Sequence, residues 1–176
     1  MSALSILPLT VAWFAAQPAA AEAQHPVHGT WTLATPEPAL RARLDQTINA
    51  AASEFNLLVR ELARRKMQGA TKVCGRYAID ISASVVRFAC DGGVVHPLPR
   101  DGRAYETTNE SGEPVRGTVT ESNRALTVTW KGVAGTRVNH FEPVGEALKL
   151  QVTVRSDHMP RPLTWTVDYG EAPAVP

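Results

Sequence analysis

The side chains best suited to metal binding or acid–base chemistry are the histidines, and the sequence spaces them widely. They are His25, His28, His96, His140 and His158. His25 and His28 lie close enough to the N-terminus for an α-amine to join them on Cu²⁺ or Ni²⁺, but they are loosely spaced and lie outside any helical pattern. Metal sites need converging ligands of defined geometry. We therefore expect no metal site and no cofactor.

The pattern of serines and carboxylates gives little support to catalysis. Ser111, in the stretch NESGEP, lies in a turn rather than in the Gly-x-Ser-x-Gly elbow of acyl-transfer enzymes. Glu121, Glu142 and Asp168 would have to converge in space to act as a glycosidase pair. We expect a protein that is not an enzyme, and a hydrolase with an unrecognised site is the remaining alternative.

Cys74 and Cys90 are the two cysteines, too far apart for a redox Cys-x-x-Cys pair. A lone pair in an exported chain is expected to form a disulfide. The flanking stretches predict a hairpin that turns at residues 81–83. Centring the turn on Ser82 places the cysteines opposite each other, whereas the apolar alternation prefers a register shifted by one, with the sulfurs on opposite faces. A bulge at Gly75 would reconcile the two. We predict the disulfide; two free buried thiols are the alternative.

The N-terminus predicts export. The apolar run LSILPLTVAWFAA is about 13 residues long, too short for a helix to span a bilayer of roughly 30 Å. Ala21-Glu22-Ala23 follows it with the small-x-small pattern of a signal-peptidase site. We expect residues 1–23 to be a cleaved signal peptide and the protein to be periplasmic or secreted, although no Lys or Arg precedes the run. A buried N-terminal helix is the alternative, and no other stretch is expected to cross a membrane.

Size and charge limit the class of protein further. A chain of 176 residues is long enough to bury a real core, and we expect one domain over residues 24–170 with a flexible tail at 171–176. The formal net charge of +1 gives no electrostatic footprint for nucleic acid. A hydrophobic content of 44% argues against disorder.

Residues 36–67 have the pattern of one long helix. A single apolar stripe follows spacings of four and three: Leu44, Ile48, Ala51, Phe55, Leu58 and Leu62. About thirty residues at roughly 1.5 Å each make some 45 Å, more than the width of a small barrel. The helix must therefore overhang, break near residues 49–53, or pack against another surface. We expect the stripe to cover the β-structure; the alternative is a partner-binding face formed by Phe55, Leu58 and Leu62.

The rest of the chain reads as short strands, with one apolar and one polar face in each. The alternation is clearest at residues 126–130, 148–154 and 163–169, and weaker at 94–98, 103–107, 115–121 and 136–141. With the strand expected at residues 27–34 and those within 72–169, tight turns join about eight to ten strands. The pattern predicts a mainly β fold, an antiparallel barrel or strongly curled sheet, with the helix inserted after the first strand.

Large rings on the inward faces are the most suggestive functional residues. Trp130, Trp165 and Tyr169 either fill the barrel or line a pocket for an apolar or amphiphilic ligand. His140, beside Phe141 in a weaker strand, is a further ligand-binding candidate; the alternative is a hydrogen-bonded strand histidine.

Four stretches carry a resemblance to a known family. They are GTWTL (29–33), RDGRAYET (100–107), ALTVTWKGVAGTRVNHFEP (125–143) and ALKLQVTVRSDHMPRPLTWTVDY (147–169). The layout resembles exported bacterial proteins of lipocalin-like (calycin) type, in which a GTW strand precedes an insertion and a run of hairpins. The resemblance implies the fold and a cavity but no established activity. It also gives Gly29 and Trp31 structural roles, with Trp31 packed across the closed end against a late basic residue, Arg155 or Arg161.

These features predict an exported, non-enzymatic binding protein for a small apolar or amphiphilic ligand held in the barrel. The alternative is an interaction module that uses the helix at 36–67 to bind another envelope protein.

Overall fold

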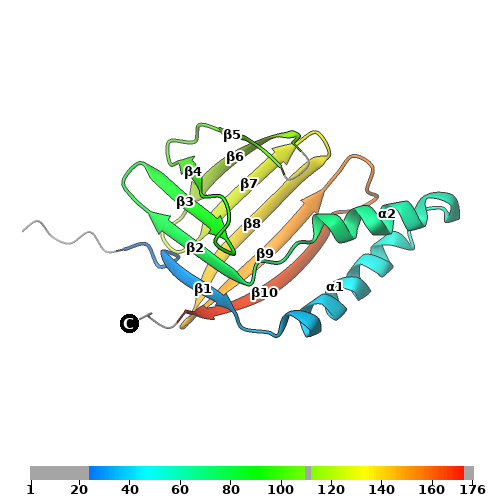
Figure 1. The fold of residues 1–176 in the computed structure, drawn as a ribbon, viewed down its shortest axis with the longest axis horizontal. Coiled ribbons are helices and arrows are strands. Elements are labelled where there is room, and N and C mark those ends of the chain that lie inside the picture. Colours follow the sequence, from blue (N-terminus) through cyan, green and yellow to red (C-terminus); the bar gives the residue numbers. More distant parts are fainter. Residues whose placement is uncertain (1–23, 110–111, 173–176) are drawn as a thin grey trace, which may run out of the picture.

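The computed structural model describes residues 24–109 and 112–172, and their strands form one curled antiparallel sheet (Figure 1). The ten strands lie in the order β4-β3-β2-β1-β10-β9-β8-β7-β6-β5. Their bounds are β1 Gly29–Leu33, β2 Arg76–Ile81, β3 Val85–Cys90, β4 His96–Pro99, β5 Tyr105–Thr108, β6 Pro114–Glu121, β7 Leu126–Gly132, β8 Gly135–Val144, β9 Ala147–Arg155 and β10 Leu163–Glu171. The predicted fold class is confirmed.

The first and last strands join the two halves of the sheet. β1 pairs with β2 and with β10, so that Trp31 lies opposite both Tyr77 and Glu171. The backbone amide of Ala172 still donates to the carbonyl of Thr30, at 2.9 Å. β10 and this hydrogen bond therefore extend two residues into the segment expected to be a tail. Residues 173–176 and the expected signal peptide at 1–23 lie outside the described residues.

The barrel is not closed by backbone hydrogen bonds. β4 and β5 are the two edges of the sheet, and no ladder joins them within the described part of the chain. β4 nevertheless lies against β5 and β6. Side chains rather than backbone hydrogen bonds must therefore seal the seam between β4 and β5.

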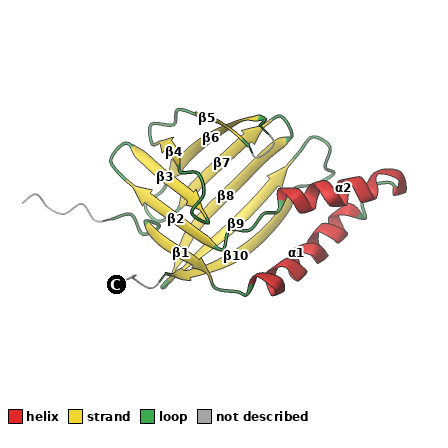
Figure 2. Ribbon diagram, in the orientation of Figure 1, coloured by secondary structure: helices red, strands yellow, loops and turns green. Residues whose placement is uncertain are grey.

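Two helices, rather than the single one predicted, connect β1 to β2 (Figure 2). α1 spans Glu37–Ala52 and α2 spans Leu57–Ala70. The chain breaks at residues 53–56, where the Asn56 side chain accepts the backbone N–H groups of Leu58 and Val59 at 3.1 and 3.2 Å. This cap favours starting a new helix over continuing the old one, because Asn satisfies N–H groups that a helix start leaves free.

The helices pack on each other and α1 packs on β10. Leu44, Ile48 and Ala51 of α1 are buried, as the apolar stripe predicted, and Leu40, outside that stripe, is buried as well. Neither helix of the described region is long and apolar enough to cross a membrane. The two helices lie at one end of the molecule, next to the end of β9 and the start of β10 (Figure 1). We call this the helix side of the barrel.

Candidate functional site

Inward-facing side chains of β6 to β10 form rows across the barrel, because directly paired residues share a face. One row reads Gly117, Trp130, Arg137, Val154 and Leu163. The next row reads Val119, Val128, Asn139, Val152 and Trp165. The helix-side half of the interior thus combines two tryptophans with an arginine and an asparagine.

An aromatic cluster fills the centre of the barrel. The Tyr77 ring lies 5.0 Å from the Phe88 ring, 5.3 Å from that of Phe141 and 5.2 Å from that of Tyr169, centroid to centroid. Tyr77, Phe141 and Tyr169 are fully or almost fully buried. The edge-to-face contacts of Tyr77 with Phe141 and Tyr169 stabilise this part of the barrel interior.

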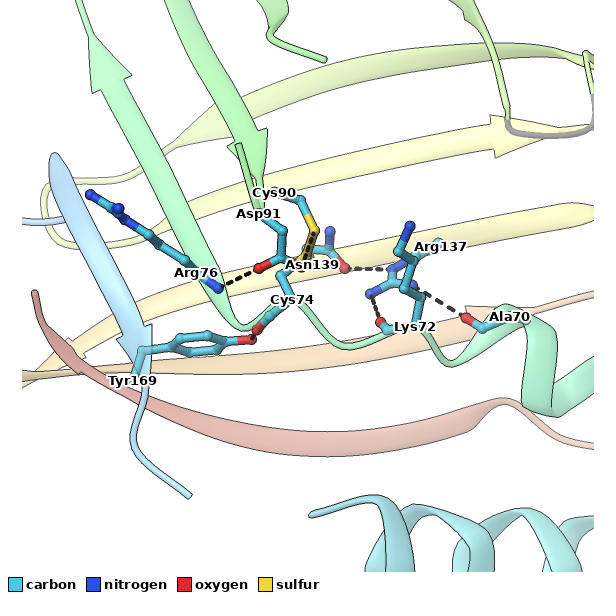
Figure 3. The surroundings of a disulfide bond; sticks show 9 residues. All are labelled: Ala70, Lys72, Cys74, Arg76, Cys90, Asp91, Arg137, Asn139 and Tyr169. Carbon is cyan, nitrogen blue, oxygen red and sulfur yellow. Dashed lines mark hydrogen bonds between the residues drawn. A yellow bond between two sulfur atoms is a disulfide. The ribbon is translucent and has the colours of Figure 1, made fainter. Parts of the chain in front are cut away.

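Arg137 is the charged side chain on the inward face of the helix-side half of the barrel. Its Nε donates to Asn139 Oδ1 at 3.0 Å. Its two terminal nitrogens donate to the carbonyls of Ala70 and Lys72, both at 3.2 Å, in the connection from α2 to β2 (Figure 3). The guanidinium carbon lies 5.7 Å from the centre of the Trp165 ring, within cation–π distance.

The electrostatics of this arginine are unusual. Burial lowers the pKa of Arg137, because desolvation disfavours its charged form, and the oxygens of Tyr77 and Tyr169 oppose that effect. Burial also raises the pKa of both tyrosines, which keeps them neutral. Among the described residues, no carboxylate lies within ion-pair distance of Arg137, which is instead held by the neutral groups of Asn139 and the backbone. The site therefore holds a partly buried cation with no carboxylate of the described residues as its counter-ion.

Arg137 and Asn139 were missed in the sequence, although a signal for them was present. Both share the period-two phase of Phe141, which is fully buried. Polar residues in the buried phase of a strand need partners and often serve function. The alternation of residues 136–141 is weak because two polar residues occupy its buried phase, and this could have pointed to the site.

Next to Arg137, the disulfide fixes the entry of β2 (Figure 3). Cys74 and Cys90 are bonded, so the predicted pairing is confirmed. The Tyr169 hydroxyl donates to the Cys74 carbonyl at 2.9 Å. The backbone N–H of Arg76 donates to a carboxylate oxygen of Asp91 at 2.8 Å. Three strands are thereby tied at one point.

The register resolves the conflict between the cysteines and the apolar alternation. Tyr77 lies opposite Cys90, and Ile79 opposite Phe88, so the phase required by the apolar residues holds. Cys74 lies before β2 begins and outside the ladder, where the backbone bends at Gly75. Because Cys74 lies outside the ladder, its sulfur can reach Cys90 although the two residues are not paired opposite each other in the strands.

Rings close the seam between β4 and β5. His96 of β4 lies 5.0 Å from the Trp130 ring and 6.0 Å from the Tyr105 ring. Its Nδ1 is buried and has no hydrogen-bond partner among the described residues, and burial lowers the pKa of the imidazole. Gly117 makes room for these rings, since a Cβ there would lie 2.5 Å from Trp130 and 2.6 Å from Leu98. Trp130 thus seals the seam as well as facing the interior.

The predicted ligand residues divide into two groups. Trp130, Trp165 and Tyr169 share the inward face, and their role toward a ligand stays a prediction. His140 fits the alternative given for it, a hydrogen-bonded strand histidine. It alternates with Phe141, so it lies on the outer face, where its Nδ1 is 2.9 Å from Thr127 Oγ1.

The carboxylates considered for catalysis do not converge. Glu121 shares the inward phase of Val119 and forms an ion pair with Arg100, at 2.7 Å. Glu142 and Asp168 both lie opposite Lys149 on the outer face. The sheet therefore separates Glu121 from the other two.

Trp31 is buried as predicted, but its partner differs. Its indole N–H donates to the Val27 carbonyl at 3.0 Å. Neither arginine takes the expected place: Arg161 pairs with Glu54, and Arg155 lies exposed opposite Thr136. Gly29 has φ +143°, a conformation that favours glycine, next to the Trp31 indole.

The residues proposed as a partner face are unequally placed. Leu58 is 94% exposed and Leu62 57%. Phe55 is half-buried and packs against the core. The apolar stripe that the sequence predicted therefore faces the core in α1 and faces outward in α2, after the break between the helices.

Two cavities lie outside the barrel interior. A groove of about 590 Å³ runs between the helices and the start of β2, lined by Glu37, Arg41, Gln68, Gly69, Lys72, Val73, Gly75 and Asp91. A second of about 360 Å³ lies beside the β9–β10 loop. Cys74, Cys90 and Asp91 bring possible ligand atoms within 4.8 Å of one another, but the disulfide removes both thiolates as metal ligands.

Comparison with known proteins identifies the architecture. No family model and no curated protein sequence matches the chain. Among solved structures, a REP1-NXSQ fatty acid transporter matches with a TM-score of 0.51 at 13% identity, over 83% of this chain and 96% of its own. Secretory abundant heat soluble protein 4 from Ramazzottius varieornatus matches with 0.52 at 15% identity, over 85% and 96%. Another such protein from the same organism matches with 0.53 at 11% identity, over 85% and 98%.

Identities this low establish the fold alone. Together with the ten-stranded order and the helices inserted after β1, they show that the chain has a calycin-type, lipocalin-like fold.

Proposed function

We propose that this protein binds a small amphiphilic ligand in the helix-side half of its barrel. The observation that carries the proposal is Arg137, a partly buried cation over Trp165 with no carboxylate partner among the described residues. A charge that is partly withdrawn from water gains from a partner of opposite sign, which an anionic ligand head would supply. The fold is shared with a protein named as a fatty acid transporter, which supports a ligand of this class.

The surroundings of Arg137 suit such a ligand. Trp130, Val154 and Met159 are only partly buried, so solvent reaches the apolar wall beside the buried Trp165. An acyl or ring system packed on these side chains would remove them from water, at about 25 cal/mol per Å². Arg137 would orient the head. The aromatic cluster around Tyr77 limits the depth that the ligand reaches.

The test compares two ligands of equal chain length. Titration of the protein with dodecanoate and with dodecanol, followed by tryptophan fluorescence, should show tighter binding of the carboxylate. Arg137→Gln should remove that preference and retain binding of the alcohol. Arg103→Gln, at an exposed arginine, is the matched control and should bind as the native protein does. Failure of both ligands to bind would refute the proposal.

The proposal includes export. Its support is the apolar run followed by Ala21-Glu22-Ala23. Expression in a bacterium should yield a periplasmic or secreted chain that begins at Gln24, as N-terminal sequencing would establish. A chain that keeps Met1 and stays in the cytoplasm would contradict this part alone.

A second candidate function is an interaction module that acts through α2. The observation in its favour is the exposure of Leu57 at 79% and Leu58 at 94%, because contiguous exposed apolar residues mark interaction sites. A photo-crosslinking residue at position 58 should capture a specific neighbour in the producing cell. The same residue at position 133, which is 85% exposed on the barrel, should not.

A further inference from the structure

α2 turns its apolar side away from the protein. Leu58 and Leu62 are four residues apart and lie on one face, and both are mostly exposed. Leu57 and Val59, 79% and 41% exposed, flank Leu58 in the same first turn. Amphipathic helices of globular proteins usually bury their leucines, so this orientation calls for a partner.

The opposite side of α2 explains the orientation. Arg60, Ala63, Arg64 and Met67 are its less exposed residues and face the molecule. A terminal nitrogen of Arg60 donates to the carbonyls of Ser53 and Phe55, at 3.1 and 3.3 Å, in the turn between the helices. The break at Asn56 rotates α2 so that these contacts form. The leucines are left outside as a consequence.

Charge accompanies the leucines in a definite order along the helix. α2 carries four cations, Arg60, Arg64, Arg65 and Lys66, and one carboxylate, Glu61. Glu61 is shared by Arg64 and Arg65. Among the described residues Lys66 has no ion-pair partner, and both Arg65 and Lys66 are exposed. From Leu58 to Lys66 the helix rises by about 12 Å, so an apolar first turn is followed by a basic turn.

From this arrangement we propose that α2 docks on an anionic lipid surface. Leu57, Leu58 and Leu62 enter the boundary between headgroups and acyl chains, and Arg65 and Lys66 lie at the level of the phosphates. Basic helices with leucines on one face bind membranes in this way. A protein surface would require acidic groups matched to each cation, whereas an anionic lipid surface supplies negative charge everywhere. The inference rests on the second candidate function, since it names the partner of the same face.

The test measures co-sedimentation with vesicles of phosphatidylglycerol and phosphatidylcholine in equal parts, and with vesicles of phosphatidylcholine alone. The native chain should bind the anionic vesicles, and binding should fall with rising salt. The double variant Leu58→Gln/Leu62→Gln should weaken binding about tenfold or more. Lys66→Gln should weaken it about fivefold.

The matched control is Val94→Gln/Val133→Gln, which removes exposed apolar surface from the barrel and leaves α2 intact. It should bind as tightly as the native chain. Since all four proteins carry the same N-terminus, the apolar run at residues 4–16 contributes equally to each. Thermal unfolding should show that every variant is folded, as expected for changes at exposed positions.

Equal binding by the α2 double variant and the native chain would overturn the inference, as would equal binding to both kinds of vesicle. If no vesicles bind, but the crosslinker at position 58 captures a protein or a second copy of this chain, the lipid surface is refuted and the interaction module survives. If no vesicles bind and the crosslinker captures nothing, both are refuted.

Discussion

The guanidinium of Arg137 lies 5.7 Å from the centre of the Trp165 ring, although β9 separates the strands that carry them. Arg137 also reaches out of the sheet to the backbone between α2 and β2. One residue therefore joins the barrel interior to the helical insertion. Its two environments lead to the first prediction.

Arg137→Gln should destabilise the fold by about 2 kcal/mol, because its hydrogen bonds to Asn139 and to the carbonyls of Ala70 and Lys72 are lost together. Urea unfolding at neutral pH measures the change. Arg103→Gln, at a side chain that is 82% exposed, should change stability by less than about 0.5 kcal/mol. Equal effects of the two substitutions would show that Arg137 does not hold the connection.

Gly117→Ala should destabilise the protein by about 1–3 kcal/mol through overpacking, since the new methyl group would collide with Trp130 and Leu98. Gly69→Ala is the matched control. It lies in α2, where a Cβ meets nothing within 4 Å, and should stabilise by about 0.5–1 kcal/mol. The two changes in the midpoint of thermal unfolding should therefore have opposite signs. A stabilising Gly117→Ala would mean that the rings do not seal the seam as described.

Cys74→Ser/Cys90→Ser should lower the free energy of unfolding by about 3 kcal/mol, because the native bond closes a loop between cysteines 16 residues apart and restricts the unfolded chain. Urea unfolding of the native protein with and without reductant gives the same comparison. The double variant should be insensitive to reductant. A native protein equally insensitive would argue against the bond.

Stability should fall as the pH falls below about 6.5, in part because of His96. Burial lowers the pKa of its imidazole in the folded state, so between that pKa and the unfolded value the unfolded chain binds more protons. The contribution of His96 is thus fully present above the unfolded pKa and is lost at acidic pH. His96→Phe keeps a ring against Trp130 and Tyr105 but does not titrate.

Thermal unfolding between pH 7.5 and 5 should therefore show a smaller loss of stability for His96→Phe than for the native protein. His158→Gln, at an exposed histidine, should follow the native curve. Parallel curves for all three proteins would exclude His96 as a contributor.

The sequence by itself determined the architecture. The period-two alternation at residues 126–130, 148–154 and 163–169 predicted strands with one buried face, and Leu126, Leu150 and Val167 are buried accordingly. Such a pattern is local, because neighbouring residues of a strand always point to opposite faces. It was also sufficient to place the helical insertion after the first strand.

Tertiary structure decided what lies between distant strands. The sequence left the face of His140 open and gave no prediction for Arg137, because the alternation of residues 136–141 is weak and only pairing with β7 and β9 sets its phase. The predicted single helix divides because the Asn56 cap and the Arg60 contacts stabilise a turn, which sends Leu58 outward. Cys74 meets Cys90 because the chain leaves the ladder before β2. The phase of β8 and the meeting of the cysteines depend on contacts between segments that no local pattern encodes, whereas the Asn56 cap lies within three residues of its partners.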